Sequence, residues 1–331
     1  MYIGAQIYRI SYVIEQMIRI VSMQFILAPA AYALPRKLAL RIANTLALLL
    51  LILPIPGLHT YRQMRSAFGK GRLDSFYLAW GWLARPLSDF VILKRLVYKR
   101  ENPFHWRIVE KNVEGINSLR ESGESYIIVS AHCAKQPGLS MFSPDVTHAN
   151  PVQIANPLPE RILSLYDLRI RLQYWALLKA YSCWQRSCEF VYIKNLRAAR
   201  TLYSRLSERG NVVFIPVDAP WGKTLTGSYE RPFAGSKSRV FSTGAAQLAQ
   251  LAKCPIISCV PLLESDGTVV LEWGEPIRIV GSGAAGNVNA MNKLFDTLEI
   301  AVGERPTQYI FEIGCDRRWN SRSRRWEDLT E

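Results

Sequence analysis

From about residue 104 onward, short apolar runs alternate with longer stretches that have one apolar side. The short runs are rich in Val, Ile and aromatic residues, which predicts strands, and the longer stretches predict helices. The predicted strands cover 106–109, 126–130, 189–193, 212–216, 256–262 and 269–273. The predicted helices cover 113–121, 159–180, 196–209, 243–252 and 287–302. Such alternation favours an α/β fold with a central, mostly parallel sheet flanked by helices.

The first hundred residues follow a different pattern, with two apolar stretches free of charged residues, 20–35 and 42–61. The leucine run of the second stretch is followed by Pro54 and Pro56, which should end its helix. A dozen helical residues cover about 18 Å, against about 30 Å of bilayer hydrocarbon. We therefore expect 1–103 to be an apolar helical region that associates with or partly enters a membrane, and 104–331 to be the α/β domain. The alternative is a set of buried helices in a soluble bundle.

The net charge of +14 favours anionic partners. Basic residues flank the N-terminal apolar runs and no recognised nucleic-acid motif is present, so we expect an anionic membrane surface and no nucleic acid. The start of the chain lacks the pattern of a removable signal peptide, so we expect this region to be retained. The flanking basic residues are Arg9, Arg19, Arg36, Lys37, Arg41, Arg62 and Arg65.

The six cysteines are not spaced like the ligands of a common zinc site, because no Cys-x2-Cys pair occurs. Most of them lie in or beside apolar segments, which is typical of reduced, packed thiols. We expect no metal and no cofactor.

Two polar residues come just after predicted strands. His132 follows the strand at 126–130, and Asp218 follows the strand at 212–216. Ligands of open α/β sheets bind at the carboxyl ends of the strands, so the two side chains could share a cleft there. A histidine in that position is suited to act as a general base.

A basic segment with glycines, 231–244, precedes the helix predicted at 243–252. Loops of this kind can hold phosphate through cationic side chains and backbone N–H groups. We expect Arg231, Lys237 and Arg239 to bind an anionic headgroup or carrier phosphate, and Phe233 and Gly235 to shape the loop. The alternatives are a solvated basic turn and a basic surface that faces lipid.

Taken in order, several short motifs resemble the lysophospholipid acyltransferase superfamily, in particular the branch of lipid A biosynthesis acyltransferases. The resemblance spans roughly residues 34 to 319. Its motifs are Leu34-Pro35-Arg36-Lys37, Arg65-Ser66-Ala67-Phe68, Ser130-Ala131-His132, Asn156-Pro157 followed by Arg169, Phe214-Ile215-Pro216-Val217-Asp218, Phe233-Ala234-Gly235, Thr243-Gly244-Ala245-Ala246-Gln247-Leu248-Ala249, Val260-Pro261, and Arg305-Pro306-Thr307-Gln308-Tyr309 near Arg318-Trp319.

The resemblance implies acyl transfer from an acyl carrier protein or coenzyme A thioester to a hydroxyl or amine of a lipid or glycolipid. His132 corresponds to the general base and Arg169 to a substrate-binding residue. The implied location is the cytoplasmic face of a bacterial inner membrane. The usual motif of the family, H-x4-D/E, includes an acidic residue that orients the imidazole.

The sequence departs from that motif, because Pro137 stands where the acid is expected. Asp218, Asp145 and Glu230 are the candidates to replace it, with Asp218 preferred because it also follows a strand. The alternative is a catalytically impaired homologue that binds a lipid or an acyl carrier in a pathway complex.

Two other readings of the site are possible. His105 and Glu110 match H-x4-E, but along a strand they would point to opposite faces about 17 Å apart. Cys133 could act as a nucleophile, although adjacent residues of an extended chain point to opposite sides.

Overall fold

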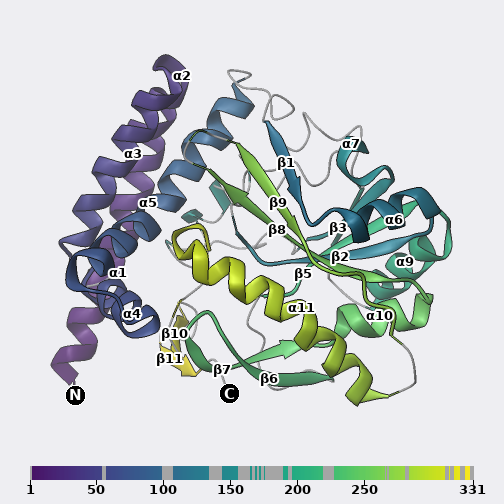
Figure 1. Cartoon of the computed structure of the whole chain (residues 1–331). Helices are drawn as coiled ribbons and strands as arrows, with labels where there is room; N and C mark the ends of the chain where they lie inside the picture. The colour runs from purple at the N-terminus through teal and green to yellow at the C-terminus, as the bar shows by residue number, and fades with distance from the viewer. Residues whose placement is uncertain are drawn as a thin grey trace.

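A seven-stranded sheet forms the centre of the molecule (Figure 1). The computed structural model describes residues 2–53, 57–98, 107–133, 144–155, 189–192, 196–218, 227–264, 268–279, 283–309, 317–320 and 325–328, and single residues at 165, 168, 169, 171, 172, 175, 266 and 313. The strands lie in the order β1 (Ile108–Lys111), β9 (Val269–Trp273), β8 (Ile256–Leu263), β2 (Tyr126–Ser130), β5 (Asn211–Pro216), β3 (Asn150–Ala155) and β4 (Glu189–Tyr192). Neighbours are parallel except β8 and β9, which confirms the α/β prediction with a mostly parallel sheet.

Both faces of the sheet are covered, as alternate residues of its central strand demonstrate. Ile127 and Val129 of β2 join a buried cluster with helices α9 (Leu196–Ser207), α10 (Gly244–Ala252) and α11 (Ala284–Glu304). Tyr126 and Ile128 join a second cluster with α6 (Glu114–Ser122), α7 (Pro144–Thr147) and the end of α5 (Arg72–Val97). Parallel sheets need this double cover, which explains why all five residues of β2 are buried.

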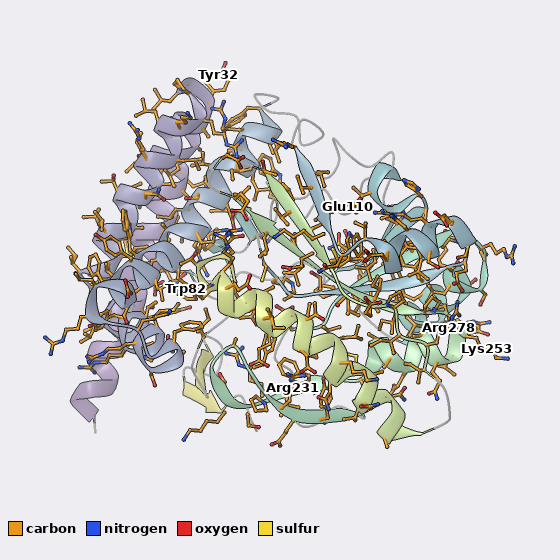
Figure 2. All side chains as sticks on the ribbon, viewed as in Figure 1. Tyr32, Trp82, Glu110, Arg231, Lys253 and Arg278 are labelled. Carbon is orange, nitrogen blue, oxygen red and sulfur yellow. The ribbon has the colours of Figure 1, made fainter. Side chains whose placement is uncertain are left out.

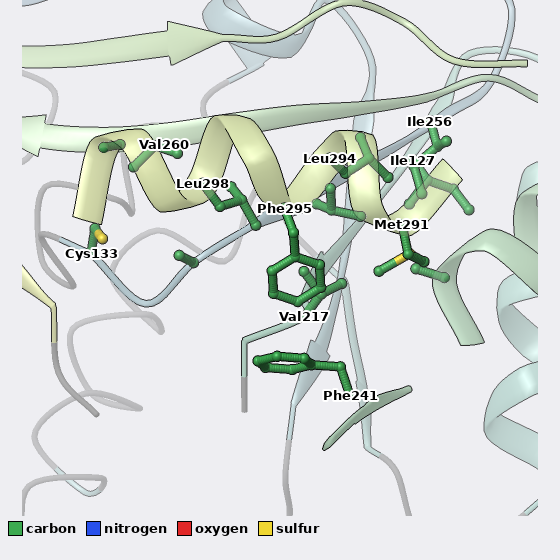
Figure 3. Packing of buried hydrophobic residues seen from close by; sticks show 14 of the residues in the cluster. Ile127, Cys133, Val217, Phe241, Ile256, Val260, Met291, Leu294, Phe295 and Leu298 are labelled. Carbon is green, nitrogen blue, oxygen red and sulfur yellow. The ribbon is translucent and has the colours of Figure 1, made fainter. Parts of the chain in front are cut away.

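Helix α11 packs its apolar stripe over one face of the sheet. Met291, Leu294, Phe295 and Leu298 recur at helical spacing and point toward the buried cluster in Figure 3. The ring of Phe241 comes from the hairpin strand β7 (Ser236–Ser242), and its centroid lies 4.4 Å from that of Phe295. The hairpin thereby belongs to the same core as the sheet.

The N-terminal helices pack beside this α/β unit (Figure 1). A continuous helical run comprises α1 (Tyr2–Val21), the π-helical segment η1 (Ser22–Leu27) and α2 (Ala28–Ala33). It is followed by α3 (Arg36–Leu51) and α4 (His59–Phe68). As predicted, α3 ends with the leucine run before Pro54.

Helix α5 joins the two parts of the described structure. Leu83 and Leu87 lie in the buried cluster of the N-terminal helices, whereas Ile92 and Leu96 lie in the cluster of the sheet. The predicted boundary at residue 103 falls outside the described residues, but the packing of α5 ties the N-terminal helices to the α/β domain.

The remaining predictions differ in detail from the structure. The helices at 113–121, 196–209, 243–252 and 287–302 are found within three residues at each end, and most of 159–180 lies outside the described residues. Strand β3 was missed because its run NPVQIA mixes Asn, Pro and Gln with apolar residues. Two hairpins, β6 (Ser228–Phe233) with β7 and β10 (Arg317–Asn320) with β11 (Arg325–Asp328), were also missed, as was the short helix η5 (Pro306–Gln308).

Candidate active site at the carboxyl edge of the sheet

His132 and Asp218 meet at the carboxyl edge of the central strands. Strands β2 and β5 are parallel neighbours, and their last residues, Ser130 and Pro216, stand opposite each other. His132 and Asp218 each lie two residues beyond that pair, so the register of the sheet brings them together. The structure therefore places His132 and Asp218 side by side, as the sequence predicted.

Both oxygens of the Asp218 carboxylate contact His132. The backbone N–H of His132 donates to Oδ2 over 2.7 Å, and the ring Nδ1 lies 2.5 Å from Oδ1. The Asp218 side chain is completely buried, whereas 26% of the His132 side chain is exposed. The carboxylate is thus fixed inside the protein while the imidazole reaches the surface.

This arrangement gives the two ring nitrogens different roles. When Nδ1–H donates to a carboxylate, Nε2 carries the lone pair and can accept a proton. The buried carboxylate then stabilises the imidazolium that forms, as in other histidine–carboxylate pairs. The geometry therefore suits a general base.

Asp218 is the candidate acid that the structure brings to His132. Glu230 lies on the hairpin, is exposed, and accepts a bond from Ser238 Oγ at 3.0 Å. Asp145 lies in α7. Pro137 lies outside the described residues.

The alternative pair of His105 and Glu110 is not favoured. Glu110 accepts bonds from Arg120 Nη2 at 2.6 Å and from Trp273 Nε1 at 2.9 Å, so its carboxylate joins β1 to α6 and β9. His105 lies outside the described residues. Glu110 is accounted for by these structural contacts.

The edge that holds His132 faces the N-terminal helices. Ala131 and Cys133 share a buried cluster with Met64 of α4 and Ala79 of α5. Cys133 also forms an isolated bridge with Tyr309, just after η5. The site therefore sits between the sheet and the region predicted to associate with a membrane.

Cys133 is a packing residue in this structure. Only 2% of it is exposed, and burial, with a smaller contribution from Asp218, raises the pKa of its thiol far above the ordinary value. A nucleophilic cysteine needs the thiolate, which this environment disfavours. We expect Cys133→Ala to keep at least half of the wild-type rate of the acyl transfer that the family resemblance implies, measured with a labelled acyl donor. Loss of all activity in a folded variant would reinstate the thiol as nucleophile.

The predicted anion-binding loop is a hairpin, which corrects the sequence prediction. Ala234 and Gly235 have φ of 52° and 75° and form a two-residue turn, with Phe233 opposite Ser236. A Cβ atom on Gly235 would lie 2.6 Å from Ala67 Cβ, so glycine permits the turn to pack against α4. The turn therefore packs the hairpin against α4.

Arg231 is bound by α11. Its Nη1 donates to the Asn292 carbonyl at 2.9 Å, and its Nη2 donates to Asp296 at 3.1 Å and to Glu299 at 2.9 Å. Its guanidinium also lies 5.3 Å from the Phe295 ring centroid. These contacts give Arg231 a structural role, the attachment of the hairpin to α11, and its predicted contact with an anion stays a prediction.

The other predicted loop residues divide into two groups. Phe233 and Arg239 are completely buried, and Arg239 Nε donates to Ser236 Oγ at 3.0 Å. The structure assigns both to the hairpin core. Lys237 is exposed, so its proposed contact with an anion stays a prediction. Arg169 is half-buried in a helical position, and its substrate-binding role also stays a prediction.

We expect Arg231→Met to lower the free energy of unfolding by about 1.5 to 3 kcal/mol, because hydrogen bonds of a charged group are lost. Denaturant titration measures this change, with Lys237→Met as the matched exposed control. The Michaelis constants should stay at the wild-type values in the Arg231 variant. A raised Michaelis constant with unchanged stability would restore its binding role.

Two residues of α5, Trp82 and Arg85, are not among the site residues predicted from the sequence. Trp82 packs against the cluster that contains Cys133. The feature that could have singled them out is the close spacing of tryptophan and arginine before Pro86 in an otherwise apolar helix.

Neither the scan against protein-family models nor the search of curated proteins found a match. Within the described part of the chain, no group of three or more His, Cys, Asp or Glu residues could hold a metal ion.

Proposed function

We propose that the chain is a membrane-associated acyltransferase. It would move a fatty acyl group from an acyl carrier protein or coenzyme A thioester to a hydroxyl or amine of a lipid or glycolipid. His132 would act as the general base, and Asp218 would orient its ring. The observation that carries this proposal is the contact of both Asp218 oxygens with His132.

The proposed reaction uses the imidazole twice. Nε2 of His132 takes the proton from the acceptor hydroxyl as its oxygen attacks the thioester carbonyl. The tetrahedral oxyanion then collapses, the C–S bond breaks, and the leaving thiolate takes the proton back from the imidazolium. Asp218 keeps Nδ1 protonated throughout and stabilises the transient positive charge.

Asp218 can also replace the acidic residue that is missing from the family motif. Pro137 was the reason to consider a catalytically impaired homologue, because the usual acid is missing. A buried carboxylate 2.5 Å from Nδ1 can perform the same orienting role from a neighbouring strand. We therefore expect the acyl-transfer assay described below to detect activity. Binding without turnover is the alternative outcome of that assay.

Helix α1 supports the membrane part of the proposal, because its polarity is inverted. Its apolar positions Ile10, Ile14, Met17 and Val21 share one helical face and are exposed. Its polar positions Ser11, Glu15, Arg19 and Ser22 recur at the same spacing and are buried. A helix that faces water would show the opposite pattern. Lipid is the solvent that suits this outer face.

The exposed apolar side chains gather on the N-terminal helices. Sixteen of the twenty-one large ones that are exposed among the described residues lie between residues 10 and 77. The segment Ile10–Ala33 is long and apolar enough to cross a membrane, and 39% of its apolar window is buried. A buried helix of a soluble protein and a signal sequence pass the same test of length and composition.

The basic residues near this surface fall into two groups, exposed and buried. Lys37, Arg41, Arg62 and Arg65 are exposed and suit contact with anionic headgroups. Arg19 departs from the sequence prediction, because it is buried and its Nε donates to Glu15 at 2.8 Å. The location at the cytoplasmic face of a bacterial inner membrane follows from the family resemblance.

The test incubates membranes that contain the protein with labelled acyl carrier protein or acyl coenzyme A and total lipid. Wild-type membranes should transfer label to lipid, and His132→Asn should abolish the transfer. His148→Asn is the matched control, because His148 is exposed and lies after α7. Equal transfer by wild type and His132→Asn would refute the proposed base. No transfer by wild type, with retained lipid or carrier binding, would favour the impaired homologue.

A further inference from the structure

Two buried N–H donors on residues three apart in α5 have no acceptor among the described residues. They are Nε1 of Trp82 and Nη2 of Arg85. Only 11% of the Arg85 side chain is exposed. A buried donor without an acceptor costs free energy, so a pair of them marks a place where a ligand oxygen would be stabilised.

The two donors lie on one face of the helix. Residues three apart are neighbours on a helix surface, so Trp82 and Arg85 project from adjoining positions of one face. Nε of Arg85 donates to Asp89 Oδ1 at 2.8 Å, one turn further along. This bond fixes the guanidinium through Nε and leaves Nη2 without an acceptor among the described residues. A guanidinium fixed in this way is suited to bind phosphate.

The same face of α5 lies beside the candidate active site. A Cβ atom on Gly81, four residues before Arg85, would lie 2.9 Å from Thr307 Cγ2 of η5. The chain after η5 reaches Tyr309, which bridges Cys133, the residue next to His132. Burial raises the pKa of the Cys133 thiol, and the charge of Arg85 acts on it in the opposite direction.

The figures agree with this placement. Trp82 lies beside the C-terminal end of α11 in Figure 2. Cys133 lies at the same end of α11 in Figure 3, beyond Leu298. The indole and the loop after β2 therefore approach a common corner of the fold.

We propose that Trp82 Nε1–H and Arg85 Nη2–H bind a phosphate group of a substrate beside His132 and Asp218. The identity of the substrate rests on the proposed acyl transfer, whereas phosphate binding itself does not require turnover. The phosphate could belong to the pantetheine arm of the acyl donor or to the head of the lipid acceptor. Either source would be positioned by the two donors while its reacting group meets His132.

Binding is tested with inorganic phosphate and the full-length protein in detergent micelles. Phosphate should raise the unfolding temperature of the wild type relative to chloride at equal ionic strength, because a ligand that binds only the folded state stabilises it. Trp82→Phe removes the donor and keeps the ring, and Arg85→Lys keeps the charge and removes the fork. Both should lose most of the phosphate-dependent shift.

Trp80→Phe is the matched control on the same helix, because Trp80 Nε1 already donates to the Asn44 carbonyl at 2.8 Å. It should keep the full shift. Equal shifts in the wild type, Trp82→Phe and Arg85→Lys would overturn the inference, and so would no shift in the wild type. His132→Asn should lose acyl transfer and keep the phosphate-dependent shift of the unfolding temperature. A failure of the proposed function can thus be told apart from a failure of phosphate binding.

Steady-state kinetics identify the source of the phosphate. Loss of one hydrogen bond to a charged group corresponds to about a tenfold to hundredfold weaker interaction. Trp82→Phe should therefore raise the Michaelis constant of one substrate by at least about tenfold. A rise for the acyl donor assigns the site to the pantetheine phosphate, and a rise for the lipid assigns it to the headgroup. No rise for either substrate would overturn the assignment to a substrate.

Discussion

Replacing Asp218 by asparagine is expected to lower kcat for acyl transfer by about 10⁴-fold, the cost of the equivalent change in serine proteases. An amide cannot stabilise the imidazolium, and its NH₂ group would favour the wrong tautomer of His132. Of the two contacts between Asp218 and His132, the substitution changes the one to the ring Nδ1, because an amide oxygen can still accept the backbone N–H. Single-turnover rates with saturating acyl donor measure the loss.

The double variant Asp218→Asn with His132→Asn provides the sharpest control. Residues that act as one unit lose activity together, so the second substitution should add little to the first. Glu230→Gln is a matched acid-to-amide change on the exposed hairpin and should keep wild-type kcat. A loss of less than tenfold in folded Asp218→Asn would contradict the role assigned to the carboxylate.

Protein folding must be separated from chemistry in this variant, because Asp218 is completely buried. An asparagine can still accept the backbone N–H of His132 through its carbonyl oxygen, so the loop after β2 should keep its position. Thermal unfolding and near-ultraviolet circular dichroism of Asp218→Asn should therefore remain close to wild type while kcat falls.

The pairing of His132 with Asp218 could be suggested from the sequence, because both residues follow apolar runs. Their positions at strand ends needed only the pattern of hydrophobic residues. Their contact required that β2 and β5 be neighbours with Ser130 opposite Pro216. That order arises from long-range packing, which no local pattern encodes. The preference for Asp218 over Asp145 and Glu230 therefore rested on position alone.

The hairpin illustrates a feature of the basic segment that the sequence did not predict. Arg231 and Arg239 look like free cations in the sequence, but one is bound by α11 and the other is buried beside Ser236. The decisive feature is local, since Ala234 and Gly235 adopt positive φ and close a tight turn. Glycine allowed such a turn, whereas alanine at positive φ is uncommon and was not expected.

The inverted polarity of α1 could not be read from the sequence either. The spacing of Ile10, Ile14, Met17 and Val21 shows that they share a face, as does the spacing of Ser11, Glu15, Arg19 and Ser22. Which face points outward depends on the surrounding helices. The structure buries the polar stripe and exposes the apolar one, and this result gives the membrane proposal its sharpest test.

Aspartate at Ile10, Ile14 and Met17 is expected to release the protein from membranes. Each aspartate in the centre of a membrane helix costs about 2.5 to 3.5 kcal/mol, so every substitution should weaken partition by about a hundredfold. Sedimentation with vesicles of anionic and neutral lipid measures the bound fraction. Ile300→Asp on α11 is the matched control, because Ile300 is 63% exposed and Ile10 is 61% exposed.

The control separates lipid contact from the general cost of adding charge. Ile300→Asp should stay bound to vesicles, since that exposed isoleucine is isolated on the α/β domain. The triple variant should keep its fold, because its altered side chains already face outward, and should transfer acyl groups only to acceptors dispersed in detergent. If the triple variant sediments with vesicles as well as Ile300→Asp does, α1 is not the lipid-facing element. The apolar outer face of α3, with Leu48 and Leu49 exposed, would then be the next segment to substitute.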